Sequence, residues 1–172
     1  MFVPAGHPPH RQIEQDPGAE VRMQLCDYAT AADARFALSR IEVDREGPSY
    51  TADTLRLIGE DRPGDELFLI LGADQAGALP DWHEPELVLE RATVAVAARE
   101  GMERESVLRR LEPLAGHDRI EFFEMPRLDI SSSLIRARAA AGEPIRYLVP
   151  DKVANYIGAK SLYGASTPVV AE

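Results

Sequence analysis

The chain has 172 residues, of which 45% are hydrophobic and 28% are charged, a composition typical of one soluble globular domain. It carries 19 Lys and Arg residues against 29 Asp and Glu residues, and the formal net charge of −10 argues against a general nucleic-acid binder. The sequence shows no apolar run of about 18 residues and no export signal. Its single cysteine, Cys26, excludes an internal disulfide. We therefore expect a cytoplasmic protein that contacts neither a membrane nor nucleic acid.

Apolar runs alternate with helical patterns along the chain. The expected strands are short apolar runs near turn residues, at positions 2–4, 35–43, 67–71, 93–97 and 120–123. The expected helices have a helical pattern, at positions 19–33, 49–60, 85–91, 103–114, 132–141 and 152–157. This alternation predicts an α/β fold with a parallel sheet flanked by helices, one domain over 1–163 and a flexible tail over 164–172.

A run of serines between an expected strand and an expected helix is the first candidate site. Ser131, Ser132 and Ser133 would open the helix, where exposed N–H groups and hydroxyls make an anion site. Arg136 follows one turn later, and its planar guanidinium could reach the same anion. The alternative is structural: the serines are helix N-caps and Arg136 is a solvated helix residue.

A glycine and a carboxylate follow the expected strand at 67–71. Ligands of open α/β sheets bind at the carboxyl ends of the strands, so Gly72 and Asp74 suit a ribose or a metal-bound phosphate. The alternative is that Asp74 is only the N-cap of the next helix.

Aromatic and hydroxyl side chains in two further segments are candidates for contact with a planar ligand. Tyr50 and Thr51 would lie beside a ligand above the sheet, although capping by Ser49 or Thr51 with Asp53 in the first turn would also explain that segment. Trp82 is the only tryptophan and lies in a loop after a strand end. It could stack on a planar ring or serve as a half-buried anchor of its loop.

A proline-stiffened loop at 4–11 carries two histidines and an arginine. His7, His10 and Arg11 could contact phosphate, or they could be solvated loop residues. The solvated alternative is favoured more strongly for His7 than for His10.

The order of these segments is more specific than any one of them. FVPAGxPPH, GPSYTxDTL, ILGADxxxxLPxWH, MPxLDISSSxIR and IRYLVPDxVxxYI follow one another from Phe2 to about Tyr163. This arrangement resembles bacterial nicotinate-nucleotide adenylyltransferase. The resemblance implies a Rossmann-like domain and, with assistance from Mg²⁺, transfer of an adenylyl group from ATP to nicotinate mononucleotide. The expected products are nicotinate adenine dinucleotide and pyrophosphate.

The resemblance also implies roles for individual residues. The expected ATP-binding set comprises Gly72, Asp74, Ile130, Ser131, Ser132, Arg136 and His10. The expected nicotinate-binding set comprises Thr51, Trp82 and His83. Arg136 is the expected catalytic cation, and no protein ligand for the metal is expected. His83 stands where the family frequently has tyrosine, and Arg11 would accompany His10 along the phosphate path.

The sequence departs from the family at its start. The family begins with GGTFDPxHxGH on its first strand and helix, and its histidines bind the transferring and leaving phosphates. This motif does not occur in the chain as printed, so a first strand–helix unit is expected to be missing. We expect that Met1 is encoded by an internal codon that has been read as the initiator. We also expect the printed chain to be unstable and inactive.

Two other functions compete with this interpretation. One is a degenerate, non-catalytic module that binds nucleotides or another protein. The other is a nucleotidyltransferase with a different acceptor, such as pantetheine phosphate. The expected partners are small-molecule substrates. The helix that includes 134–141 could pack inside the domain or against a second copy in a homo-oligomer.

Overall fold

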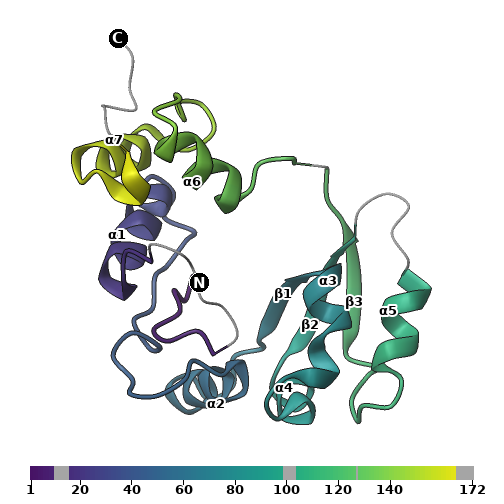
Figure 1. Ribbon diagram of the computed structural model, residues 1–172. Coiled ribbons are helices and arrows are strands. Elements are labelled where there is room, and N and C mark those ends of the chain that lie inside the picture. Colours follow the sequence, from purple (N-terminus) through teal and green to yellow (C-terminus); the bar gives the residue numbers. More distant parts are fainter. Residues whose placement is uncertain (10–15, 99–103, 127, 166–172) are drawn as a thin grey trace. The chain divides into compact units, whose positions relative to one another are not determined.

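The computed structural model describes residues 1–9, 16–98, 104–126 and 128–165 (Figure 1). The chain divides into two compact units. One unit comprises Met1–Ser49 with Asp129–Glu172, and the other comprises Tyr50–Leu128. The single-domain prediction for 1–163 stays a prediction, and residues 166–172 of the predicted tail lie outside the described residues.

The second unit, Tyr50–Leu128, is built on a three-stranded parallel sheet with the order β1-β2-β3. Ile70 pairs with Ala95, and Val96 pairs with Phe122. Its strands are β1 (Phe68–Gly72), β2 (Thr93–Ala98) and β3 (Ile120–Glu124). Its helices are α2 (Thr51–Asp61), α3 (Ala73–Gly77), η1 (Leu79–Asp81), α4 (Pro85–Arg91) and α5 (Arg104–Leu111). The predicted α/β fold with a parallel sheet is therefore confirmed.

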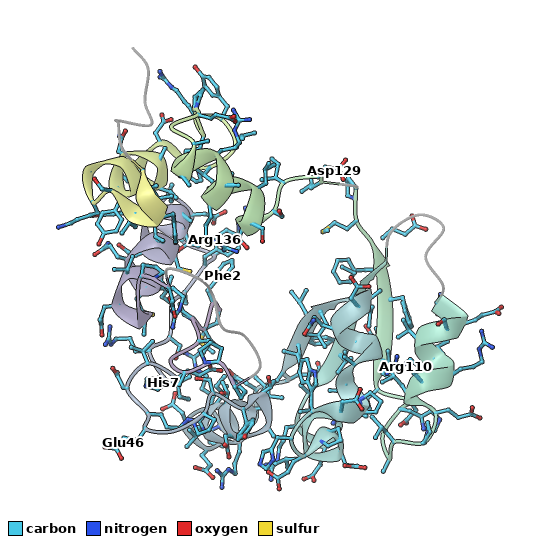
Figure 2. All side chains as sticks on the ribbon, viewed as in Figure 1. Phe2, His7, Glu46, Arg110, Asp129 and Arg136 are labelled. Carbon is cyan, nitrogen blue, oxygen red and sulfur yellow. The ribbon has the colours of Figure 1, made fainter. Side chains whose placement is uncertain are left out.

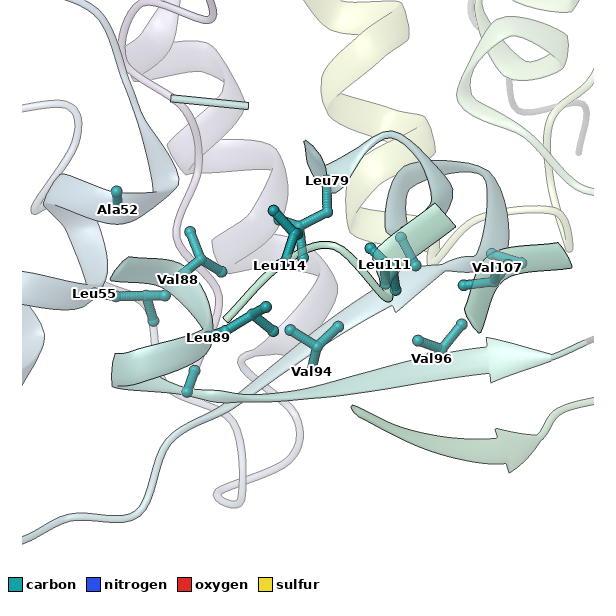
Figure 3. Close-up of a cluster of buried hydrophobic side chains, with 13 residues drawn as sticks. Ala52, Leu55, Leu79, Val88, Leu89, Val94, Val96, Val107, Leu111 and Leu114 are labelled. Atoms are coloured by element: carbon teal, nitrogen blue, oxygen red, sulfur yellow. The ribbon is translucent and has the colours of Figure 1, made fainter. Parts of the chain in front are cut away.

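One hydrophobic core holds this unit together (Figure 3). Val94 and Val96 of the central strand are fully buried, as are Leu79, Leu89 and Leu111 from the helices that cover them. Burial of each such side chain stabilises the fold by roughly 1.5–3 kcal/mol. This core fixes the carboxyl end of β1, where the predicted ribose contacts lie.

The strand β1 is buried on one face only. Leu69 and Leu71 pack against the core, whereas Phe68 is 50% exposed and Ile70 is 69% exposed. Alternate side chains of a strand point to opposite faces, and in this unit the helices of the core cover the face of Leu69 and Leu71.

The first unit is a cluster of helices around a second hydrophobic core. The elements are α1 (Ala19–Thr30), α6 (Ser132–Ala140), α7 (Asp151–Ala159) and η2 (Leu162–Gly164). Ile145 and Ala154 are fully buried in this core, and Ile135 belongs to it. The rings of Tyr28 on α1 and Tyr156 on α7 meet edge to face at 5.3 Å. Within the described residues, no helix is long and apolar enough to cross a membrane.

The strand predicted at 35–43 is wrong in the structure. Among the described residues, its only ladder contact is a single parallel bridge between Leu38 and Phe2. The chain turns immediately afterwards, because the Asp44 N–H donates to the Arg40 carbonyl at 2.9 Å and the Arg40 guanidinium bonds the Asp44 carboxylate at 2.8 Å. A turn closed in this way ends the extended backbone that a longer strand requires.

Candidate functional site

Gly72 lies at the carboxyl end of β1, where an open α/β sheet binds its ligands. Its backbone has φ −73° and ψ 157°, which any residue can adopt. A Cβ added at Gly72 would meet no heavy atom within 4 Å. The fold of the described residues therefore does not require glycine at position 72. A ligand that approaches the backbone closely at this position would require glycine.

Asp74 lies in the first turn of α3 and is exposed. The N-cap of that helix is Gly72, which provides no side-chain hydrogen bond. The alternative interpretation of Asp74 as an N-cap is therefore wrong. Asp74 lies two residues beyond Gly72, next to the strand end at which the sequence predicts a ribose contact.

The predicted nicotinate set gathers where α2 begins. The Tyr50 ring lies on the His83 ring with 4.3 Å between centroids and 32° between planes. Thr51 is the first residue of α2 and follows Tyr50 directly. Trp82 precedes His83 and is held in place because its N–H donates to the Leu79 carbonyl at 3.0 Å. The ring contact thus joins the start of α2 to the 82–84 loop and brings Thr51, Trp82 and His83 into one region.

The structural alternatives for these segments have mixed outcomes. Trp82 is partly buried against the core of its unit, so its anchoring role is confirmed. Capping of α2 by Ser49 or Thr51 is wrong, because the N-cap residue is Tyr50, which makes no side-chain cap, and Thr51 is already the first residue of the helix. The Ser49 hydroxyl instead accepts the N–H groups of Gly6 at 3.1 Å and His7 at 3.0 Å.

The predicted phosphate set lies at the start of α6 in the other unit (Figure 2). The Ser131 hydroxyl accepts the Leu134 N–H at 3.1 Å, so its N-cap role is confirmed. Arg136 donates from Nη2 to the Ser133 hydroxyl at 3.1 Å. Ser132 is exposed in the first turn, and Ile130 is 47% exposed just before the cap. The serines thus form the helix start that the anion-site interpretation requires.

Arg136 and Arg138, both on α6, have different hydrogen-bond partners. The guanidinium of Arg138 donates to the Pro144 carbonyl at 2.9 Å and pairs with Glu143 at 3.0 Å. Arg136 has a neutral hydroxyl as its hydrogen-bond partner and is partly buried. Arg138 therefore fastens the end of its own helix, whereas no ion pair of Arg136 occurs among the described residues.

Tyr163 and Arg22 are two residues of this unit that the motif analysis did not select. Burial raises the pKa of the Tyr163 hydroxyl, and the charges of Arg136, Asp16 and Arg22 also act on it. Tyr163 has φ 60°, a strained value for a residue with a side chain. Tyr163 lies at the end of the segment over which the sequence resembles the family, whereas Arg22 lies in α1 outside the quoted motifs.

The loop at 4–7 is tightly enclosed within the first unit. Pro4 and Gly6 are buried, and a Cβ on Gly6 would stand 2.1 Å from the Glu42 carbonyl oxygen. His7 is exposed. His10 and Arg11 lie outside the described residues.

Comparison with known proteins identifies relatives along almost the whole chain. The cytidylyltransferase-like family model matches residues 1–138. A probable nicotinate-nucleotide adenylyltransferase of Geobacillus thermodenitrificans (strain NG80-2) is 42% identical, with 98% of this chain and 73% of the relative covered. A protein of the same name from Corynebacterium kroppenstedtii (strain DSM 44385 / JCM 11950 / CIP 105744 / CCUG 35717) is 40% identical, with 95% and 75% covered.

A solved structure shares the fold. Plasmodium falciparum nicotinic acid mononucleotide adenylyltransferase complexed with NaAD superposes with a TM-score of 0.66 at 18% identity. The superposition covers 95% of this chain and 82% of that chain. At this level of identity the likeness concerns the fold alone.

Proposed function

Because the chain belongs to the cytidylyltransferase-like family and, within it, to the nicotinate-nucleotide adenylyltransferases, we propose that it transfers the adenylyl group of ATP to nicotinate mononucleotide. The products are nicotinate adenine dinucleotide and pyrophosphate. The observation that carries the proposal is 42% identity over 98% of the chain to a relative of that name.

The reaction requires the protein to position the two substrates and to offset negative charge. An oxygen of the mononucleotide phosphate attacks the α-phosphorus of ATP, the bond from that phosphorus to the bridging oxygen breaks, and pyrophosphate leaves. No covalent intermediate with the protein is required. Catalysis then depends on holding two anions in line and on offsetting the charge that develops on the oxygens.

We propose that the start of α6 holds the ATP phosphates. The N–H groups of the first helical turn and the Ser132 hydroxyl supply hydrogen-bond donors, and Ser131 and Ile130 shape the turn that leads into them. Arg136 supplies the positive charge one turn later and is the proposed catalytic cation. Its neutral hydrogen-bond partner, the Ser133 hydroxyl, supports this assignment.

We propose that the second unit recognises the nucleosides. Gly72 would let the adenosine ribose approach the end of β1, and Asp74 would accept hydrogen bonds from its hydroxyls. Thr51, Trp82 and His83 would contact the nicotinate ring and its carboxylate. The open space at Gly72 and the contact between Tyr50 and His83 support these roles.

Mg²⁺ is proposed to bind together with the ATP phosphates. In the described part of the chain, no group of three or more His, Cys, Asp or Glu side chains is placed to hold a metal ion. No step of the proposal therefore passes through a metal held by these residues. His10 is proposed to line the phosphate path, on the basis of the family resemblance.

We also propose that the protein acts in the cytoplasm on small-molecule substrates, without nucleic acid or a membrane. The net charge of −10 supports the absence of a nucleic-acid partner. A homo-oligomer is compatible with the 40% exposure of Leu134 on α6.

Product formation tests the function. The protein purified from its native source is incubated with ATP, Mg²⁺ and one of three acceptors: nicotinate mononucleotide, nicotinamide mononucleotide or pantetheine phosphate. We expect pyrophosphate and nicotinate adenine dinucleotide to appear in equal amounts with the first acceptor. Faster turnover with pantetheine phosphate would contradict the proposed acceptor. Nucleotide binding without turnover would instead support a non-catalytic module.

A further inference from the structure

The imidazole of His83 has two neighbours that lie at the starts of different helices. Its ring lies on that of Tyr50, the residue before α2, with 4.3 Å between centroids. Its Nε2 is 3.5 Å from Oε2 of Glu84, the residue before α4. The ring contact and the carboxylate together therefore fix which nitrogen of His83 faces an acid.

The fold fixes the backbone of the residue that carries this acid. Glu84 has φ 49° and ψ 59°, the left-handed conformation that residues with a side chain rarely adopt. Its carbonyl oxygen accepts the N–H groups of Leu87 at 3.1 Å and Val88 at 3.3 Å. Val88 is fully buried in the core around β2. The start of α4 therefore places Glu84 directly after His83 in a defined conformation.

The pair of His83 and Glu84 is able to change its net charge near neutral pH. A histidine usually gains or loses its proton between about pH 5 and 8, whereas a glutamate is usually ionised throughout that range. With a neutral imidazole the pair carries the negative charge of the glutamate. With a protonated imidazole the pair is uncharged as a whole.

The adjoining elements carry charges of a different kind. Arg56 of α2 donates to the Asp53 carboxylate at 2.8 Å, and Arg110 of α5 is 3.5 Å from the carboxylate of Asp81, the last residue of η1. Glu86 is exposed in the first turn of α4. Guanidinium and carboxylate groups usually keep their charge between pH 6 and 8. The variable charge among these groups is therefore that of His83.

We propose that the pair of His83 and Glu84 determines how strongly the protein prefers an acceptor whose ring carries a carboxylate over one whose ring carries an amide. This inference rests on the proposed function, in which His83 contacts the nicotinate ring and its carboxylate. The negative charge of Glu84 repels that carboxylate, and a protonated His83 cancels the repulsion. The preference for nicotinate mononucleotide over nicotinamide mononucleotide is therefore greatest at low pH and falls as His83 loses its proton.

The expected effect is small because the pair is in contact with water. Two unit charges about 4 Å apart in water change an equilibrium by about fivefold. The side chains of His83 and Glu84 are 46% and 54% exposed, and exposed charge pairs usually contribute less than this limit. We therefore expect the preference to change by about two- to fivefold between pH 6 and 8.

The ratio of kcat/KM for the two acceptors measures the preference. The protein purified from its native source is assayed from pH 6 to 8 with saturating ATP and either nicotinate or nicotinamide mononucleotide. Both acceptors have the same phosphate and undergo the same reaction, so the ratio cancels pH effects on ATP, on that phosphate and on the shared chemical step. We expect the ratio of nicotinate to nicotinamide mononucleotide to fall about two- to fivefold as the pH rises.

Three variants made in the native gene assign this change to the pair. His83→Tyr keeps a ring that can lie on Tyr50 but has no charge change in this range, so its ratio should be constant with pH. Glu84→Gln should raise the ratio about two- to fivefold at pH 8, because the repelling charge is gone. Glu86→Gln is the matched control, which removes one negative charge two residues along the chain and should leave the ratio nearly unchanged.

Proton uptake on binding separates this inference from the proposed function. Calorimetric titration at pH 7 in two buffers of different ionisation enthalpy measures the protons taken up with each acceptor. Nicotinate mononucleotide should take up more protons than nicotinamide mononucleotide does, and His83→Tyr should abolish the difference. Absence of turnover would refute the proposed function, whereas the uptake difference would still support the inference. Equal uptake with both acceptors, or a ratio of kcat/KM that depends on pH equally in His83→Tyr and the unaltered protein, would overturn the inference.

Discussion

Replacement of Gly72 by alanine should separate ligand binding from stability. The added methyl group would meet no heavy atom of the described residues within 4 Å, and the backbone at φ −73° carries no strain for alanine. If the ribose of ATP approaches this backbone, the methyl group would occupy the space that the ribose needs. The substitution should therefore impair ATP use without unfolding the protein.

The effect on stability follows from two opposing terms. Replacement of glycine by alanine at a compatible backbone stabilises by about 0.4–1 kcal/mol, because the unfolded chain loses freedom. At a helix N-cap, however, alanine is less favourable than glycine by an amount on the order of 0.5–1 kcal/mol. Gly72 is the N-cap of α3, so the terms offset and the free energy of unfolding should change by less than about 1 kcal/mol.

The assay is steady-state adenylyl transfer at varied ATP, paired with thermal melting. Gly59→Ala is the matched control, because Gly59 lies inside α2 of the same unit and its Cβ would also meet nothing within 4 Å. We expect the KM for ATP to rise at least about tenfold in Gly72→Ala, equivalent to about 1.4 kcal/mol of lost binding. Gly59→Ala should melt slightly higher and keep the original KM. Equal KM values for the two variants would refute the ribose assignment.

Three further changes address other parts of the molecule. Leu89→Ala, at a fully buried position of the core around β2, should lower the free energy of unfolding by about 2–5 kcal/mol in a denaturant titration, and a change below that range would indicate a looser core. Arg136→Met should lower kcat by about 100- to 1,000-fold. The control Arg138→Met, on the same helix, should lower kcat far less. Similar losses in the two variants would contradict the assignment of Arg136 as the catalytic cation. His83→Ala should raise the KM for nicotinate mononucleotide by about two- to tenfold, because an aromatic pair with Tyr50 is worth about 0.5–1.5 kcal/mol. His83→Tyr should restore the original KM. Equal KM values for the two variants would exclude a role for this ring contact.

The sequence predicted the elements that have a clear hydrophobic pattern. The strands β2 and β3 and the helix α4 were located within a residue or so, because their apolar runs lie between turn residues and are buried in one core. The helix α3 was not predicted, because five residues are too few to show a helical period. The strand predicted at 35–43 was wrong, because the ion pair and turn between Arg40 and Asp44 are not visible in hydropathy.

The candidate site was predictable only where neighbouring residues in the sequence carry it. The N-cap role of Ser131 and the position of Gly72 at the end of a strand follow from local patterns. The contact of Tyr50 with His83 joins residues far apart in the sequence, and it depends on where α2 and the 82–84 loop are placed. Arg22 was missed because, besides the Asp16 carboxylate, its partners are the backbone carbonyl oxygens of Ala5 and Gly6, which no sequence pattern marks.

The enclosed Gly6 and the exposed Gly72 should tolerate substitution differently during evolution. At Gly6 the Glu42 carbonyl oxygen occupies the place of a side chain, so any larger residue would have to be accompanied by a shift of the neighbouring chain. Such coupled changes are rare, and this position should be constrained in every descendant that folds, whether or not it keeps an activity. Gly72 has no such neighbour. It should drift freely once selection for ATP use is relaxed, so its identity in a lineage records whether the activity has been maintained.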